Sequence, residues 1–311
     1  MTNYFGGLGW IGFKKETTPG IAEATVAQFL QTESFVLNQD HKLIDLKANF
    51  GSIGDLPNLT GTLTPQGKAT GILLAASLPH PFYWALGKVT TTGTAAPYSH
   101  TITPDVNLPS LTVEGNEVAI KMKQSGVMIN KLSLKCAAGE VAKLDMEWIG
   151  LKHTDNATLT STPVYVTDFL TFAVGTISIG GTTVTNVGDI QLTIDNGFEA
   201  LFSINNTRYP ADIVRKNKPK ISGKISFIDF PTTLYNNLIN ASTFSLTLQF
   251  TSSNGNSLKI EIPAAQFQKG FDKEIKAENI TADADFTVFQ DTATGKIITV
   301  TAVNQVADLT V

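Results

Sequence analysis

Leu59-Thr60-Gly61-Thr62-Leu63-Thr64 alternates apolar and polar residues around a glycine, and Ile221-Ser222-Gly223-Lys224-Ile225-Ser226 repeats this pattern 162 positions later, from 59 to 221. The segments after each copy also correspond: a proline, a helix-like stretch, an alternating strand and a closing hairpin. These are 65, 68–78, 111–113 and 144–148 in the first half, and 231, 232–242, 246–248 and 283–288 in the second. Because the period far exceeds the roughly 20–50 residues of solenoid repeats, the sequence predicts a duplicated domain.

Composition favours an ordered and weakly charged protein. The chain has 311 residues, enough for two domains of about 150 residues that each bury a core. Hydrophobic residues make up 42% and charged residues 16%, the opposite of a disordered chain. The net charge is −4, and Arg208 and Arg215 are the only arginines, which argues against sequence-specific nucleic-acid binding. No signal-peptide pattern and no apolar run of about 20 residues is present, so we expect a soluble chain that is not exported.

Period-two alternation dominates from residue 29 onward and predicts strands with one buried face. Two stretches favour short helices. In 68–78, Thr64 is a candidate cap and Pro65 a candidate first helical residue, and 232–242 places apolar residues at i, i+4. Two long segments, 38–57 and 196–219, read as irregular loops just before the two glycine-centred strands, and 87–109 reads as a third loop without a counterpart.

The expected organisation is therefore an N-terminal arm (1–25), a first β domain (26–151), a polar linker (152–167) and a second β domain (168–311). The arm is rich in glycine and threonine and carries Trp10 and Phe13. Aromatic residues on an unsupported segment need a surface to cover them. A partner subunit is the favoured surface and the chain's own domain is the alternative, so deleting residues 1–20 is expected to leave folded subunits that do not polymerise.

The sequence contains no complete catalytic motif. The stretch 61–69 has five residues between its glycines where a phosphate loop needs four, and Ala69 stands where a Ser or Thr must ligate magnesium. There is no G-x-S-x-G or H-E-x-x-H, and the four histidines lack ligand spacing. Cys136 is expected to be a small core residue. We predict no enzyme activity, no cofactor and no metal.

The sequence resembles a known family, the major tail tube proteins of long-tailed, siphophage-like bacteriophages, in its double-domain form. Residues 8–20 (LGWIGFKKETTPG) resemble that family's glycine-rich opening arm. Residues 98–104 (YSHTITP) followed by 108–113 (LPSLTV), and 126–134 (GVMINKLSL), are similar to two further family stretches. Residues 208–214 (RYPADIV) resemble part of the second half of the double-domain members.

The resemblance implies two β-barrel or β-sandwich domains, each with one short flanking helix. Three chains would form a pseudo-hexameric ring, and rings would stack into a tube that lies in the virion tail and is assembled in the host cytoplasm. The implied partners are other copies of the chain, tape-measure, tail-tip and tail-terminator proteins, and double-stranded DNA in passage, with no membrane. The long loops would stack the rings, with Arg208, Asp212, Arg215 and Lys216 as candidates, and Trp10 and Phe13 would act in the assembly arm.

A tube for DNA needs an inner wall that does not trap phosphates, so we expect that wall to be neutral or negative. Asp145 and Glu147, and Asp283 and Asp285, lie on well-alternating segments and are the candidate lumen residues. A solvated outer face explains the same pattern. The alternative function is a carbohydrate-binding or adhesin β-sandwich module of a virion or cell surface, with the aromatic cluster 81–84 in its pocket.

Overall fold

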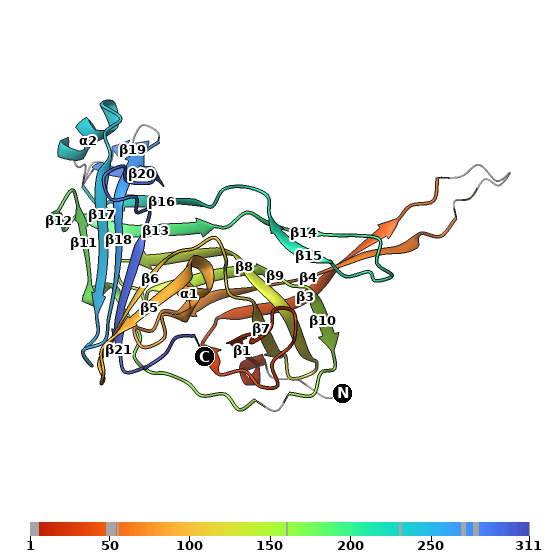
Figure 1. Ribbon diagram of the computed structural model, residues 1–311. Coiled ribbons are helices and arrows are strands. Elements are labelled where there is room, and N and C mark those ends of the chain that lie inside the picture. The colour runs from red at the N-terminus through yellow and green to blue at the C-terminus, as the bar shows by residue number, and fades with distance from the viewer. Residues whose placement is uncertain are drawn as a thin grey trace.

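The computed structural model describes residues 6–47, 54, 56–159, 161–229, 232–268, 272–275 and 280–310. This part of the chain is mainly β, as the sequence predicts, with the helices α1 (His80–Leu86) and α2 (Thr232–Ile239) (Figure 1). Helix α2 lies in the second stretch that favoured a helix. Two short 3-10 turns, Gly6–Leu8 and Phe172–Val174, complete the helical segments described.

The strands of the first half end at β10. They are β1 (Trp10–Lys15), β2 (Gln28–Leu30), β3 (Ser34–Ile44), β4 (Leu59–Leu73), β5 (Gly87–Thr92), β6 (Tyr98–Pro104), β7 (Leu111–Asn116), β8 (Lys121–Ala137), β9 (Lys143–Ile149) and β10 (Lys152–Asp155). The second half contains β11 (Gly175–Ile179), β12 (Thr182–Val184), β13 (Val187–Asp195), β14 (Phe198–Leu201), β15 (Asp212–Arg215), β16 (Lys220–Phe227), β17 (Phe244–Thr251), β18 (Ser257–Phe267), β19 (Asp272–Ile275), β20 (Ile280–Val288) and β21 (Thr299–Asn304).

The two halves share one order of strand pairing. The first half pairs its strands as β1–β7–β8–β9–β4–β3, and the second as β11–β17–β18–β20–β16–β13. In each half the helix follows, along the chain, the fifth strand of this order (β4 or β16) and precedes the second (β7 or β17). The β5–β6 hairpin is the main addition to the first half.

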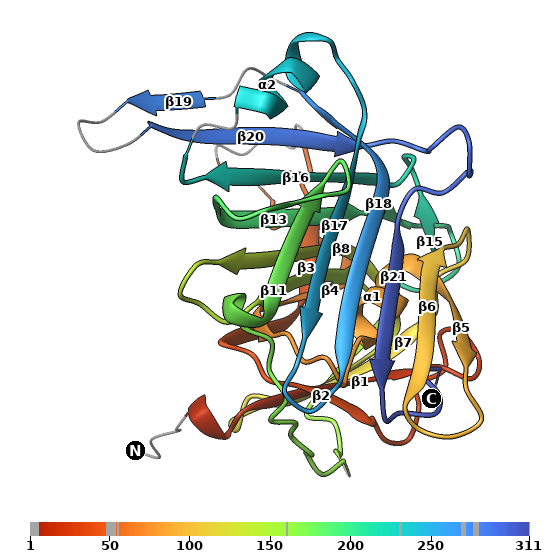
Figure 2. The same ribbon diagram turned by 90° about the vertical axis from the view of Figure 1, so that its left-hand side faces the viewer.

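The halves are joined through their sheets. Strand β8 pairs with β13 over seven residues, from Lys131 opposite Asp195 to Ala137 opposite Asp189. This joint produces one sheet of eight strands in the order β3–β4–β9–β8–β13–β16–β20–β19. Figure 2 shows β19, β20, β16 and β13 one below the other in this sheet. A second layer runs β5–β6–β21–β18–β17–β11–β12, so the C-terminal strand β21 closes against the inserted hairpin of the first half.

The apolar faces of the layers enclose the core. Phe13 is fully buried there, with its ring 5.0 Å from that of Trp84 and 5.5 Å from that of Trp148. Its strand, β1, pairs with β7 and β2 of the same chain. The favoured prediction that a partner subunit covers Phe13 is therefore wrong, and the alternative, its own domain, is what the structure shows. Removing residues 1–20 would remove a strand of the fold.

The predicted helix over 68–78 is also wrong. Residues up to Leu73 extend β4, which pairs with β3 on one side and β9 on the other. Gly67 lies directly on the Trp148 ring, where a Cβ atom would come within 2.4 Å of it, and Ala69 and Ile72 are buried. The capping signal of Thr64 and Pro65 is overridden because this strand closes the core between two neighbours. The helix of the first half instead begins at His80.

The three predicted loops are largely hairpins. Residues 38–44 belong to β3, and β3 with β4 forms a long arm that projects from the body (Figure 1). Residues 48–53 and 55, at its end, lie outside the described residues. The segment 196–219 contains β14 and β15, which pair with each other, and 87–109 contains β5 and β6. The glycine-centred motifs lie on corresponding strands but at different points along them. Gly61 lies in the arm, at the register shift between β3 and β4, whereas Gly223 lies between β13 and β20.

Candidate assembly surfaces

The face of the eight-stranded sheet that points away from the core is polar and charge-balanced. Residues directly opposite each other on neighbouring strands share a face, so the register defines rows across the sheet. One row alternates in sign: Lys68, Glu147, Lys131, Asp195 and Lys220. Between β4 and β20 this face carries six lysines and six carboxylates: Lys68, Lys131, Lys135, Lys143, Lys220 and Lys224, with Asp145, Glu147, Asp189, Asp195, Asp283 and Asp285.

The four candidate lumen residues all lie on this face. Lys135 Nζ lies 2.5 Å from Asp145, and Lys224 Nζ lies 2.6 Å from Asp283. Burial alone would raise the pKa of both carboxyl groups, but these lysines lower it, so each pKa is below its ordinary value. Glu147 and Asp285 are exposed and lie opposite lysines. The sequence was sufficient to predict that these carboxylates lie on a polar face, but not which lysines neutralise their charge.

The second half's hairpin packs on the arm of the first half. Arg208 Nε donates to the Gly61 carbonyl oxygen at 2.7 Å, and the Leu63 amide donates to the Arg208 carbonyl oxygen at 2.9 Å. The Tyr209 hydroxyl donates to the His153 carbonyl oxygen at 3.1 Å. A groove of about 720 Å³ remains between arm and hairpin, and its lining includes Lys42, Leu43, Ile44, Phe202 and Arg208.

The remaining candidate stacking residues also have neighbours in their own chain. The Arg215 guanidinium lies 5.1 Å from the centre of the Phe198 ring, and burial lowers its pKa. Lys216 pairs with Glu199 at 2.7 Å, with both side chains more than half exposed. Asp212 accepts a hydrogen bond from the following amide, that of Ile213. The structure thus gives these residues roles within the subunit, and their part in stacking stays a prediction.

Replacing Arg208 with alanine should loosen this contact. The variant loses a charge-assisted hydrogen bond to a part-buried carbonyl, a loss of about 1.5–3 kcal/mol in the free energy of unfolding. Urea unfolding measures that loss, and hydrogen exchange should show faster exchange of the Leu63 amide. Lys216→Ala is the matched control, because its exposed ion pair contributes at most about 1 kcal/mol. Equal losses in the two variants would contradict the contact.

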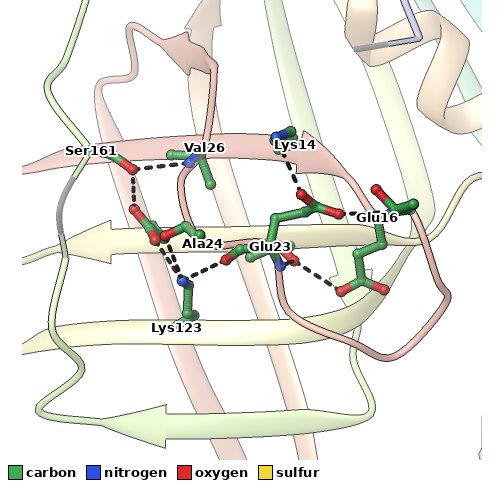
Figure 3. A network of polar contacts seen from close by, with 10 residues as sticks. Lys14, Glu16, Glu23, Ala24, Val26, Lys123 and Ser161 are labelled. Carbon is green, nitrogen blue, oxygen red and sulfur yellow. Dashed lines mark hydrogen bonds and ion pairs between the residues drawn. The ribbon is translucent and has the colours of Figure 1, made fainter.

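A buried polar network fixes the rest of the predicted arm and part of the linker (Figure 3). The Glu16 carboxylate accepts hydrogen bonds from the Ser110 and Thr112 hydroxyls and from the Gly20 and Gly126 amides, at 2.6 to 3.0 Å.

A second cluster lies beside Glu16. Lys123 pairs with the buried Glu114 at 2.9 Å and donates to the Glu23 carbonyl oxygen at 2.7 Å. Ser161, in the linker, donates to Glu114 at 2.6 Å and accepts from the Val26 amide at 2.9 Å. Residues 16–26 and Ser161 are therefore held against β7 and β8, and Trp10 keeps its ring 5.5 Å from that of Phe29. The assembly role of Trp10 stays a prediction.

The other candidate chemistry is limited. The aromatic residues of 81–84, which the adhesin alternative places in a pocket, are at most 5% exposed and pack in the core. Cys136 is half-buried, and burial raises the pKa of its thiol to about 11. In the described part of the chain, no group of three or more His, Cys, Asp or Glu residues is placed to hold a metal ion. None of the helices among these residues has the length and apolar character to cross a membrane.

The chain matches a known protein family. A family model described as phage tail tube protein matches residues 9–288, which span both halves of the chain and include all eight strands of the polar sheet. No curated protein matches the chain.

Proposed function

The chain belongs to the phage tail tube protein family, and we propose that three copies form a pseudo-hexameric ring and that such rings stack into a tube that conducts double-stranded DNA. As a member of this family it is a structural protein of the virion tail, and the family is not an enzymatic one. Tape-measure, tail-tip and tail-terminator proteins are the proposed further partners, and assembly takes place in the host cytoplasm. The two halves then derive from one duplicated unit, a proposal supported by their shared pairing order.

The charge-balanced face of the eight-stranded sheet is the observation that carries the DNA-conduit proposal. Each lysine or arginine that contacts a phosphate adds salt-sensitive affinity and slows sliding. On this face lysines and carboxylates are equal in number, the row through Glu147 alternates in sign, and the ion pairs of Lys135 and Lys224 neutralise two of the lysines. A wall with these properties lets DNA pass without holding it. Electron microscopy of the purified protein tests the assembly: stacked rings or tubes support it, and isolated subunits at high concentration count against it.

Reversing charge on the inner wall should turn the conduit into a DNA trap. In tubes of Glu147→Lys with Asp285→Lys, each new lysine that meets a phosphate steepens the salt dependence of DNA binding by roughly 0.9 in log–log slope. If this face lines the lumen, short duplex DNA is retained inside the tube and resists nuclease. The control is Glu117→Lys with Glu261→Lys, which makes the same change outside the polar face. Nuclease-sensitive DNA on both variants would contradict a polar-face lumen.

A further inference from the structure

The chain contains two Asn-Gly dipeptides, and they lie in opposite environments. They are Asn196–Gly197, between β13 and β14, and Asn254–Gly255, in the turn between β17 and β18. An asparagine that precedes glycine can cyclise, because the glycine has no side chain to hinder the attack of its amide nitrogen on the asparagine side chain. In a folded protein the reaction also requires that the two residues can move into the geometry of attack.

Asn196 is buried, and hydrogen bonds fix its side-chain amide. The residue is 2% exposed, and its Nδ2 group donates to the carbonyl oxygens of Ala85, at 3.0 Å, and Ile129, at 2.9 Å. A Cβ atom on Gly197 would lie 3.2 Å from the Cβ atom of Asn217, so the glycine is enclosed as well. Because Ala85 and Ile129 belong to the first half, Asn196 can react only after the two halves separate locally.

Asn254 lies instead at the exposed tip of a hairpin. Its Nδ2 group donates to the Asp168 carboxylate at 3.2 Å, a hydrogen bond that is itself exposed to solvent. A Cβ atom on Gly255 would meet no atom within 4 Å, so the space around this glycine is open. The Gly255 amide donates to the Ser252 carbonyl oxygen at 3.1 Å, and such a turn bond at a hairpin tip opens at little cost. Both residues are therefore free to reach the geometry of attack.

We propose that Asn254 is a site of spontaneous deamidation and that the fold protects Asn196 from the same reaction. The Gly255 backbone nitrogen attacks Cγ of Asn254 and forms a new N–Cγ bond. The Cγ–Nδ2 bond breaks, and the Nδ2 group leaves as ammonia with the proton of the Gly255 amide. Water then opens the succinimide ring at either of its two carbonyl carbons and gives aspartate or isoaspartate. The net change converts an amide and water into a carboxylate and ammonium, so solvent water is the only co-reactant.

Asn254 takes part in a contact that ties its hairpin to the start of the second half. Besides its Nδ2 group, the Asp168 carboxylate accepts hydrogen bonds from the Ser252 hydroxyl, at 3.2 Å, and the Asn256 Nδ2 group, at 2.6 Å. The Asp168 carbonyl oxygen accepts from the Ala76 amide of the first half, at 3.3 Å. A carboxylate at position 254 replaces one donor with a like charge, and isoaspartate lengthens the main chain of the turn. The modification therefore weakens this contact.

A time course on the purified chain tests the site. The protein is incubated at mildly alkaline pH, and peptide digestion with mass spectrometry follows the conversion of amide to acid at each asparagine. We expect deamidation at Asn254 to be at least about tenfold faster than at Asn196, because a buried amide reacts only from locally opened states. Isoaspartate among the products identifies the succinimide, since direct hydrolysis gives aspartate alone. In urea-denatured protein the two rates should become nearly equal, because the fold no longer distinguishes the two dipeptides.

Two variants accompany the time course. Asn254→Gln keeps the side-chain amide but cannot close the five-membered ring, so the modification at this position should disappear. Asn254→Asp carries the charge of the product, and hydrogen exchange should show faster exchange of the Ser252 amide, which donates across the turn to the Asn256 carbonyl oxygen at 2.8 Å.

The native time course decides the proposal. If Asn254 stays intact in the folded protein, or if Asn196 deamidates as fast, the proposed site is overturned. If the Asn254→Asp variant exchanges its Ser252 amide no faster than the parent, the weakened contact at Asp168 is overturned. Selective deamidation at Asn254 with isoaspartate, lost in Asn254→Gln, supports the site.

Discussion

Phe13→Ala should destabilise the isolated subunit by about 3–5 kcal/mol, since it removes a fully buried aromatic ring from a packed core. The Phe13 ring packs against Trp84 of α1 and Trp148 of β9, so the surrounding side chains have little freedom to fill the cavity. Urea or thermal unfolding of dilute, unassembled protein measures the loss.

Leu8→Ala is the matched control in the same segment. Leu8 is 65% exposed, and a surface substitution of this kind changes stability by no more than about 0.5 kcal/mol. If Phe13→Ala left the subunit's stability unchanged and only prevented polymerisation, the residue would act in assembly and its place in the core would be wrong.

Stability should fall as the pH drops from about 6.5 to 4, because His80 is buried without a hydrogen-bond partner for either ring nitrogen in the described structure. Burial, together with a smaller effect of the nearby His100, lowers its pKa from 6.5 to about 4, and Asp308 opposes this shift. The native state keeps the ring neutral while the unfolded chain takes up a proton below pH 6.5. The contribution of the neutral His80 ring to the free energy of unfolding is complete above pH 6.5. Between pH 6.5 and about 4 it decreases by roughly 1.4 kcal/mol per pH unit, about 3 kcal/mol in all.

Comparison with His80→Leu isolates this effect from that of the carboxylates. Leucine has nearly the same volume as histidine and removes the two ring nitrogens that lack a hydrogen-bond partner, so the variant should equal or exceed the parent in stability at pH 7. The stability difference between the two proteins should widen toward pH 4. His41→Leu is the control, since His41 is exposed on the arm. A parallel pH dependence in parent and His80→Leu would show that His80 does not carry the effect.

Alternation along the chain was sufficient to predict a mainly β protein and the polar faces, but not the neighbours of each strand. The stretch 65–73 has a helical start signal in Pro65, yet it is a strand because Gly67 must admit the Trp148 ring. No local pattern reveals that contact, which joins residues about 80 positions apart. The sequence also predicted loops at 87–109 and 196–219, because these stretches are rich in glycine and polar residues. Both contain short hairpins, which contacts with the other half of the chain stabilise.

The sequence was sufficient to predict which residue types lie on the polar face, but not which of them form ion pairs. Asp145 and Asp283 stand on alternating segments, so their polar face followed from period two. Their lysine partners, Lys135 and Lys224, lie on neighbouring strands, and only the register brings them together. The surface that buries the aromatic residues of the arm was not predictable either. The glycine-rich sequence around Phe13 does not indicate whether its ring packs in the core of its own chain or against another subunit.

The pairing of β6 with β21 has a consequence for how the chain folds. Ile102 lies opposite Val300, so the second layer closes only when residues 198 positions apart meet. Contacts of such separation form late and slow the overall reaction, because the entropy of closing the intervening chain must be overcome first. Until then β6 offers an unpaired edge. Chains that fold at high concentration should therefore associate through β6 in non-native aggregates. Conditions that slow the folding of the second half, such as a low concentration of denaturant, should increase the aggregated fraction, in proportion to the protein concentration.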